Sequence, residues 1–497
     1  MMRSFATAAR RSAVRLAQRR ISTAALSAAL SSPKPPTLVD VRPIAAFNGW
    51  RLGAEARGGH LPGALTFPLS WLDGTEEDPA HLTTVLADKG INKSQTIVTY
   101  GYNAKDSAKL ANKLKELGFT DVDTYPEGQA VWAEDASRPL ATMPRYEKLV
   151  HADWVRRVLN GQAVEHPPSS AATPQVFHVH YQKVEDYWNG HIPGAAQFDT
   201  MTLEEPVTWN RRSPAELEAS LLHHGITADT TVILYGRTSD PQPWQPKPGQ
   251  QAGQIAATRA ALILMYAGVK DVRLLDAGLG AWERAGFQVT RDPFYPANTG
   301  VTSFGAKIPQ QPQLIVDLPE AKTIIADKAG GALVSIRSWK EWIGETSGYN
   351  YIAAKGDIPG AIFGNCGSSA YHMQTYRNPD NTMRPFYEIE QMWKEIGITG
   401  DKRVAFYCGT GWRASETFLY AYYLGWDKMA VYDGGWFEWS TLNPQPYRTG
   451  PPEEEKADTK PRFGFDGTHT MDKADRWMRI TGKEEAVNNT NLMKHHK

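Results

Sequence analysis

One segment of the sequence has the residue types and spacing of a nucleophilic site. Cys408 follows the apolar run Val404–Tyr407 and opens the segment Cys-Gly-Thr-Gly-Trp-Arg, after which a helical pattern begins. A strand that turns through glycines into a helix N-terminus directs main-chain N–H groups at an anion, and the helix dipole adds about half a positive charge. Free cysteine has a pKa of about 8.5, which such a setting lowers by one to several units. We therefore predict that Cys408 is a nucleophilic thiolate at neutral pH.

The rest of this loop is expected to bind a substrate or to shape its site. Gly409 and Gly411 let the backbone fold tightly around a sulfur atom, because glycine tolerates unusual backbone angles. Thr410 is placed to donate a hydrogen bond to the sulfur or to cap the following helix. Trp412 either excludes water from the site or packs in the core. Arg413 is expected to bind an anionic substrate group, and the alternative for it is an ion pair with a carboxylate.

The second cysteine of the chain has no comparable context. Cys366, in Gly-Asn-Cys-Gly, is expected to be a buried and inert thiol, since cysteine is among the most frequently buried residues. Two cysteines supply neither a disulfide framework nor a four-thiolate metal site, and no histidine stands at ligand spacing beside them. We expect neither a metal nor an organic cofactor.

The elements that must position Cys408 occur three times along the chain. A Gly-x-x-Pro-Gly-Ala motif follows one β-rich run and precedes another, and helical patterns separate the strands, so each copy predicts a parallel sheet flanked by helices. The fold class is therefore α/β with three tandem domains. The motifs begin at Gly59, Gly190 and Gly356, the first runs are Thr37–Val41, Gln175–Val179 and Ala332–Ile336, and the second runs are Ile97–Tyr100, Val232–Tyr235 and Val404–Tyr407.

Only the third copy has a nucleophile. Gly101 and Gly236 stand where the third copy has Cys408, so the first two domains are expected to be inactive scaffolds. The second copy also carries a Pro/Gly-rich loop insertion around Ser239–Gln254. The predicted boundaries are 1–32 for a transit peptide, 33–145, 146–300 and 301–450 for the three domains, and 451–497 for a charged tail.

The first 32 residues form a leader with its own composition. They contain six arginines and no acidic residue, and Arg11, Arg15 and Arg19 recur at helical spacing. This pattern is typical of a mitochondrial transit peptide, so we expect delivery to the matrix. The whole chain has 54 basic and 54 acidic residues among 497, which gives no global field for nucleic acid or an anionic membrane. It also has no apolar run of the length that a membrane span needs.

The threefold pattern, the Gly-x-x-Pro-Gly-Ala motif and the cysteine loop together resemble the rhodanese family, over about Lys34 to Gly450. The loop is most similar to that of the three-domain thiosulfate sulfurtransferases. This resemblance implies that Cys408 takes the outer sulfur of thiosulfate, holds it as a persulfide and passes it to cyanide or another thiophilic acceptor, including a protein thiol. It also implies that Arg413 binds the anionic donor, with Arg337 assisting or bracing the loop. Ser335 stands where the family usually has an acid, which leaves the partner of Arg337 open.

Other assignments use the same loop. A dual-specificity phosphatase needs five residues between its cysteine and arginine, and here Cys408 and Arg413 are separated by four, so the loop is too short for a phosphoryl group. A 3-mercaptopyruvate sulfurtransferase shares the Cys-Gly-Thr-Gly opening but not the Trp-Arg ending. A sulfur-relay protein, which passes its persulfide only to a partner, is a third alternative. The sequence leaves the donor, the acceptor and the oligomeric state open.

Overall fold

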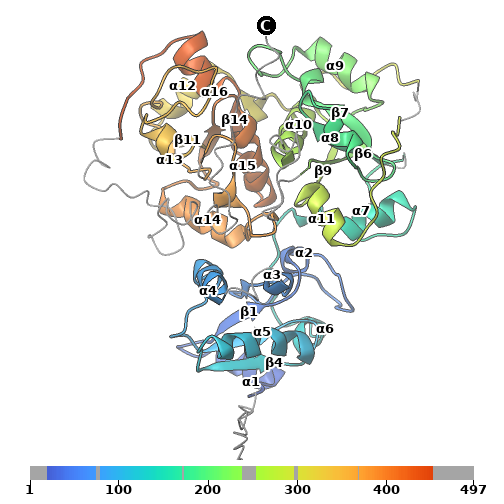
Figure 1. Ribbon diagram of the computed structural model, residues 1–497, viewed down its shortest axis with the longest axis vertical. Coiled ribbons are helices and arrows are strands. Elements are labelled where there is room, and N and C mark those ends of the chain that lie inside the picture. The colour runs from blue at the N-terminus through green and yellow to red at the C-terminus, as the bar shows by residue number, and fades with distance from the viewer. Residues whose placement is uncertain are drawn as a thin grey trace, which may run out of the picture. The chain divides into compact units, whose positions relative to one another are not determined.

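The computed structural model describes residues 19–73, 79–170, 173–237, 253–295, 300–367 and 369–451. The chain divides into two compact units, of which the first comprises Met1–Pro43 and Gly53–Leu140. The second comprises Ile44–Leu52 and Ala141–Lys497. The first unit contains one parallel sheet and the second contains two (Figure 1). The predicted fold class, three α/β domains with parallel sheets, is therefore confirmed.

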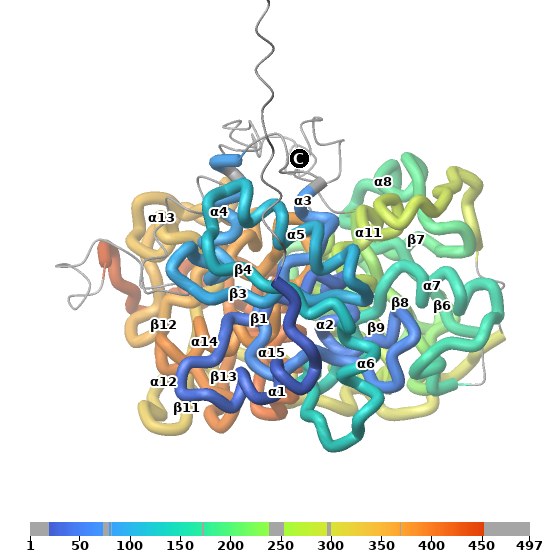
Figure 2. The backbone as a smooth tube through the Cα atoms, turned by 90° about the horizontal axis from the view of Figure 1, so that it is seen from below, coloured from blue at the N-terminus to red at the C-terminus, as the bar shows by residue number. Residues whose placement is uncertain are grey.

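The first unit is built on a four-stranded sheet in the order β2-β1-β3-β4. Its apolar residues are buried on both faces, as expected for a parallel sheet, and helix α5 lies along β3 and β4 (Figure 2). The strands are β1 (Thr37–Asp40), β2 (Leu65–Thr66), β3 (Ile97–Tyr100) and β4 (Val122–Tyr125). The helices are α1 (Thr23–Leu30), α3 (Ser70–Asp73), α4 (Pro79–Asp88), α5 (Ala104–Glu116) and α6 (Gly128–Glu134).

The second unit has two five-stranded sheets of the same order, β5-β9-β8-β6-β7 and β10-β14-β13-β11-β12. In each sheet the strand that leads into the nucleophile position, β8 or β13, is central. The first sheet has β5 (Leu149–Val150), β6 (Gln175–His180), β7 (Ala196–Asp199), β8 (Thr231–Tyr235) and β9 (Asp271–Leu275). The second has β10 (Ile315–Val316), β11 (Gly331–Ser335), β12 (Ile362–Phe363), β13 (Arg403–Tyr407) and β14 (Met429–Tyr432).

Helices cover both sheets of the second unit. Local signals set some of their ends: α9 begins at Pro214, and Ser213 and Glu216 cap it reciprocally. The α-helices are α2 (Ile44–Asn48), α7 (Ala152–Leu159), α8 (Glu185–Trp188), α9 (Pro214–His223), α10 (Gly253–Ala267), α11 (Gly278–Arg284), α12 (Leu318–Ala326), α13 (Trp339–Trp342), α14 (Phe386–Glu395), α15 (Trp412–Tyr423) and α16 (Gly435–Phe437). Single turns are η1 (Tyr146–Lys148), η2 (Thr200–Thr202), η3 (Pro312–Leu314), η4 (Gln374–Tyr376) and the π-turn η5 (Glu438–Leu442).

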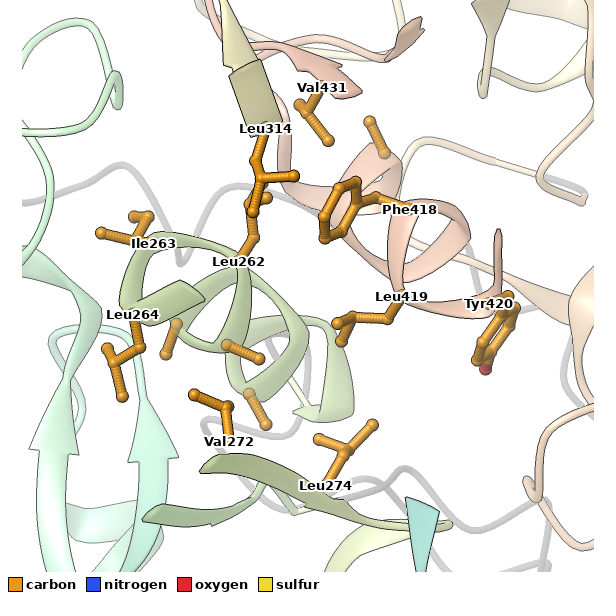
Figure 3. Packing of buried hydrophobic residues seen from close by; sticks show 14 of the residues in the cluster. Leu262, Ile263, Leu264, Val272, Leu274, Leu314, Phe418, Leu419, Tyr420 and Val431 are labelled. Atoms are coloured by element: carbon orange, nitrogen blue, oxygen red, sulfur yellow. The ribbon is translucent and has the colours of Figure 1, made fainter. Parts of the chain in front are cut away.

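Helix α10 of the second domain packs directly against α15 of the third. Leu262 on α10 lies beside Phe418 and Leu419 on α15 in one continuous buried cluster (Figure 3). Each such side chain contributes roughly 1.5–3 kcal/mol when it is fully buried. The second and third domains therefore share a hydrophobic core, and the helix that follows Cys408 is held from the second domain.

The structure differs from the prediction at one domain boundary and at the start of one helix. Residues Ile44–Leu52, expected in the first domain, belong to the second unit, where Trp50 packs edge-on against Tyr146 and donates to the carbonyl of Leu149 at 3.1 Å. Helix α15 begins at Trp412, three residues before the predicted start at Ser415, because Gly411 at φ 81° ends the loop. Arg413 therefore lies in the first turn of the helix rather than in the loop.

The leader, the insertion and the tail fall largely outside the described residues. Residues 1–18, 238–252 and 452–497 belong to this group. From Arg19 onward the leader belongs to the first unit: Ile21 donates to the carbonyl of Thr124 at 2.9 Å, and Leu26 is buried. Along the described part of the chain, no helix combines the length and apolarity needed to cross a bilayer.

Candidate active site

Cys408 lies at the carboxyl end of the central strand β13, immediately before the turn into α15. This is the edge of a parallel sheet where α/β proteins bind their ligands. The side chain is 1% exposed, so the thiol is enclosed in this state of the protein. The four residues Cys408–Gly411 form the whole turn.

The peptide groups of the cysteine loop are anchored by the segment after β14. Trp436 donates to the carbonyl of Cys408 at 2.8 Å, and Phe437 donates to that of Gly409 at 3.0 Å. Gly435 lets the two segments come this close, because it has no side chain and its φ is 53°. A Cβ at Gly435 would lie 2.7 Å from the carbonyl oxygen of Cys408 and 2.6 Å from that of Gly409. The anchored carbonyls turn the following N–H groups to the opposite side of the loop.

The same anchor is present in the other two domains. The backbone N–H of Gln129 donates to the carbonyl of Gly101 at 3.0 Å, and that of Leu279 donates to the carbonyl of Gly236 at 2.9 Å. Gly101 and Gly236 therefore occupy the place of Cys408, in agreement with the sequence comparison of the three copies. These two sites have the loop anchor of the third domain without a nucleophile.

Tyr349 approaches the loop from the segment after α13. Its hydroxyl accepts a hydrogen bond from the N–H of Gly409 at 3.1 Å and another from Nη2 of Arg413. Since both acceptor positions of the phenol are used, its own O–H must point elsewhere. Burial raises the pKa of Tyr349 well above its usual value, so the phenol is protonated at neutral pH and is available as a donor.

Arg413 is held by a carboxylate that the sequence analysis did not single out. Its Nη1 and Nη2 each donate to Glu341 at 3.0 Å, and the arginine side chain is 2% exposed. Burial by itself would raise the pKa of Glu341, but Arg413 and Arg337 bring it down to about 2. The charge of Arg413 is thus balanced by Glu341 inside the protein, as in the alternative of an ion pair with a carboxylate, and its binding of an anionic donor stays a prediction.

Arg337 lies behind the site, where it contacts Glu341, the carboxylate partner of Arg413. It is fully buried, and its guanidinium donates to Glu341 at 3.2 Å, Asp357 at 3.1 Å and the carbonyl of Gly356 at 2.6 Å. Asp357 also accepts from Ser335 at 2.9 Å and from the hydroxyl of Tyr407. Asp357 therefore supplies the carboxylate that Ser335 lacks.

Cys366 lies close to the site but is not built as a nucleophile. It is fully buried, and Nη1 of Arg413 is 2.9 Å from its sulfur. Burial raises the pKa of this thiol to about 12, despite the opposing effect of Arg413. The thiol is therefore protonated at neutral pH, which agrees with the predicted inert role.

Aromatic side chains from both domains gather on the other side of the loop. Trp412 packs edge-on against Tyr181 of the second domain, with ring centres 5.2 Å apart. The ring of Tyr351 lies 4.7 Å from Trp209, 5.2 Å from Tyr349 and 5.4 Å from Phe437, centre to centre.

Sequence reasoning missed four residues of this arrangement: Glu341, Tyr349, Asp357 and Glu204, which accepts from Trp412 at 3.0 Å. One signal was available, because Asp357 occupies the motif position that is histidine in the other two copies. The other three come from distant segments that carry no motif. Within the described ranges, no group of three or more His, Cys, Asp or Glu side chains is arranged to hold a metal ion.

Comparison with known proteins agrees with the threefold architecture. The rhodanese-like domain family matches residues 22–135, 174–285 and 317–442. The thiosulfate sulfurtransferase YnjE of Escherichia coli (strain K12) is 40% identical over 412 residues, which cover 83% of this chain and 88% of the relative.

Solved structures provide two further comparisons. The anaerobic ergothioneine biosynthesis enzyme from Chlorobium limicola, in complex with its natural substrate trimethyl histidine, is 45% identical with a TM-score of 0.81, covering 88% of this chain and 100% of that one. An EanB variant with a cysteine persulfide, in a tetrahedral intermediate state with ergothioneine, is 44% identical with a TM-score of 0.81. It covers 87% of this chain and 100% of its own.

Proposed function

This chain belongs to the rhodanese family of sulfurtransferases, and we propose that it transfers sulfane sulfur through a persulfide on Cys408. In the first step the thiolate attacks the outer sulfur of thiosulfate, the S–S bond of the donor breaks, and sulfite leaves with the bonding electron pair. In the second step an acceptor such as cyanide attacks the terminal sulfur, and the Cys408 thiolate leaves. This double displacement needs no oxidant or reductant.

The observation that carries the proposal is the contrast between the two cysteines of the third domain. Cys408 lies in the anchored turn at the end of β13, next to a phenol whose O–H can donate a hydrogen bond. Cys366 is held as a neutral thiol under Arg413. Only Cys408 therefore has the setting of a sulfur carrier.

A second candidate acceptor is the imidazole ring of a trimethylated histidine, and a specific observation favours it. In EanB, a tyrosine lies 59 positions before the persulfide cysteine and a threonine two positions after it. Tyr349 and Thr410 have the same spacings from Cys408 in this chain. The rings of Trp209, Tyr351 and Phe437 add π-faces of the kind that bind quaternary ammonium groups.

Transfer to such an acceptor is balanced in the same way. The terminal persulfide sulfur bonds to a ring carbon, the S–S bond breaks, the proton of that carbon is released, and the Cys408 thiol is restored. The product is a thiolated imidazole. The phenol of Tyr349, which stays protonated because burial raises its pKa, offers an O–H hydrogen bond to the reacting ring.

Intact-mass analysis after incubation with thiosulfate tests the shared first step. We expect a gain of about 32 Da on the peptide that contains Cys408, and none in Cys408→Ser. The Cys366→Ser variant, the matched control, should still gain the mass. A Cys408→Ser protein that retains turnover would contradict the proposal.

Turnover assays then separate the acceptors and the alternatives. Thiocyanate formation from cyanide supports the thiosulfate sulfurtransferase, and a thiolated product from trimethylhistidine supports the second candidate. If Cys408 forms its persulfide faster with 3-mercaptopyruvate than with thiosulfate, 3-mercaptopyruvate is the preferred donor. Transfer only to a partner protein would support a sulfur relay.

We also propose that the basic leader directs the chain to the mitochondrial matrix. Since Ile21 pairs with Thr124 and Leu26 is buried in the first unit, we expect cleavage before these residues. A fluorescent fusion with and without the first 18 residues tests the targeting, and N-terminal sequencing of the imported protein tests the cleavage site.

A further inference from the structure

We propose that the second domain, which has no nucleophile, holds the reactive loop of the third domain through Glu204 and Arg259. This inference rests on the proposed function, because it gives these two residues a positioning role in the chemistry of Cys408. Neither residue belongs to a sequence motif, and both come from segments far from the cysteine.

Glu204 and Arg259 contact the C-terminal end of the cysteine turn and the segment that anchors it. Glu204 accepts from the indole Nε1 of Trp412 at 3.0 Å, at the first residue of α15. Arg259, on α10, donates to the same carboxylate oxygen of Glu204 at 2.6 Å and to Asp433 at 2.7 Å. Asp433 directly precedes the Gly434-Gly435 turn that anchors the loop carbonyls. The two residues thus connect the end of the loop with its anchor.

Arg259 also limits the space around the loop. A Cβ at Gly411 would lie 3.0 Å from Nη1 of Arg259, so the guanidinium packs against the backbone where the turn becomes helix. Both Arg259 and Glu204 are fully buried. A buried ion pair in this position fixes geometry more than it adds stability, because desolvation offsets much of its attraction.

The ionisation of Glu204 allows its positioning role to be tested by changing the pH. Burial raises the pKa of Glu204 to about 7, although Arg259 lowers it. The groups that face it are Arg259 on α10, Asp433 after β14, Trp412 on α15 and Tyr181 after β6, with Arg211 beside Asp433. The carboxylate form binds Arg259 and Trp412 more strongly than the neutral acid does. The loop should therefore be held most firmly above about pH 7.

The test is the pH dependence of persulfide formation in wild type and Glu204→Gln. The amide imitates the protonated acid, so the two rates should agree near pH 5.5. At pH 8.5 wild type should form the persulfide about tenfold to 100-fold faster than Glu204→Gln. Glu205→Gln, which removes the neighbouring carboxylate outside this network, should follow wild type throughout. A wild-type to Glu204→Gln ratio that stays constant over this range would overturn the proposal.

A second measurement does not depend on catalysis or on this variant folding. The indole ¹⁵N–¹H resonance of Trp412, assigned by its absence in Trp412→Phe, should shift with pH around 7 in wild type. A resonance that does not titrate would overturn the proposed link to Glu204. If instead wild type forms no persulfide while this resonance titrates, the proposed function fails and the contact itself stands.

Discussion

Arg337 pairs with Asp357 at 3.1 Å, whereas the equivalent Arg42 of the first domain pairs with Asp40 at 2.7 Å. Asp40 lies on the first strand of its domain, and Asp357 lies in the Gly-x-x-Pro-Gly-Ala motif. At these two positions the first domain has Asp40 and His60, and the third has Ser335 and Asp357. The carboxylate that pairs with the arginine therefore comes from the first strand in the first domain and from the Gly-x-x-Pro-Gly-Ala motif in the third.

This relocation predicts a rescue by exchange. Asp357→Asn leaves Arg337 with one carboxylate instead of two, and we expect a loss of about 3 kcal/mol in the free energy of unfolding. The double variant Ser335→Asp/Asp357→His, which restores the arrangement of the first domain, should recover at least half of it. Urea unfolding measures both, with the exposed Asp401→Asn as control, expected within about 0.5 kcal/mol of wild type. Additive losses in the double variant would contradict the exchange.

Glu341 predicts a specific response to acid. Its pKa falls from 4.5 to about 2 on folding, so its carboxylate contributes stability that is fully present above about pH 4.5 and is lost as the pH falls toward 2. The shift corresponds to roughly 3 kcal/mol. Glu341→Gln should be less stable at pH 7 and should lose less further stability between pH 4.5 and 2.5. Unfolding curves at several pH values check this, and parallel losses in both proteins would speak against it.

Gly435 and Gly397 form a matched pair of glycines. Both have positive φ, 53° and 75°, but only Gly435 faces the carbonyl oxygens of the cysteine loop, while no atom lies within 4 Å of a Cβ at Gly397. Alanine at either position should cost about 1–2 kcal/mol for the left-handed backbone. Gly435→Ala should also displace the loop and lower turnover at least tenfold, measured under conditions where both proteins are folded. Equal activities would show that the anchor does not control the nucleophile.

Cys366 should resist alkylation in the folded protein. Its pKa of about 12 and its burial leave almost no thiolate at pH 8. Iodoacetamide followed by peptide mapping should label Cys366 only after denaturation. Loading with thiosulfate before the treatment should leave the Cys366 peptide unchanged in mass. Persulfide found on Cys366 would give it a role in sulfur transfer that its setting does not predict.

The repeats, the α/β class and the nucleophile could be predicted from sequence because each depends on local pattern. Alternating strands and helices produce a parallel sheet, and a cysteine between a strand and a glycine turn is recognisable within eight residues. The start of α15 was missed by three residues because the backbone of Gly411, rather than residue preference, ends the loop.

The partners of the loop were decided only by the tertiary structure. Glu341 neutralises Arg413 from a segment 72 positions away, and Glu204 reaches Trp412 from 208 positions away in another domain. The sequence specified that an arginine follows the cysteine, but which charge that arginine meets depends on which buried segments fold against it. Burial of the Arg413 guanidinium requires a nearby carboxylate, and the tertiary fold decides which residue supplies it.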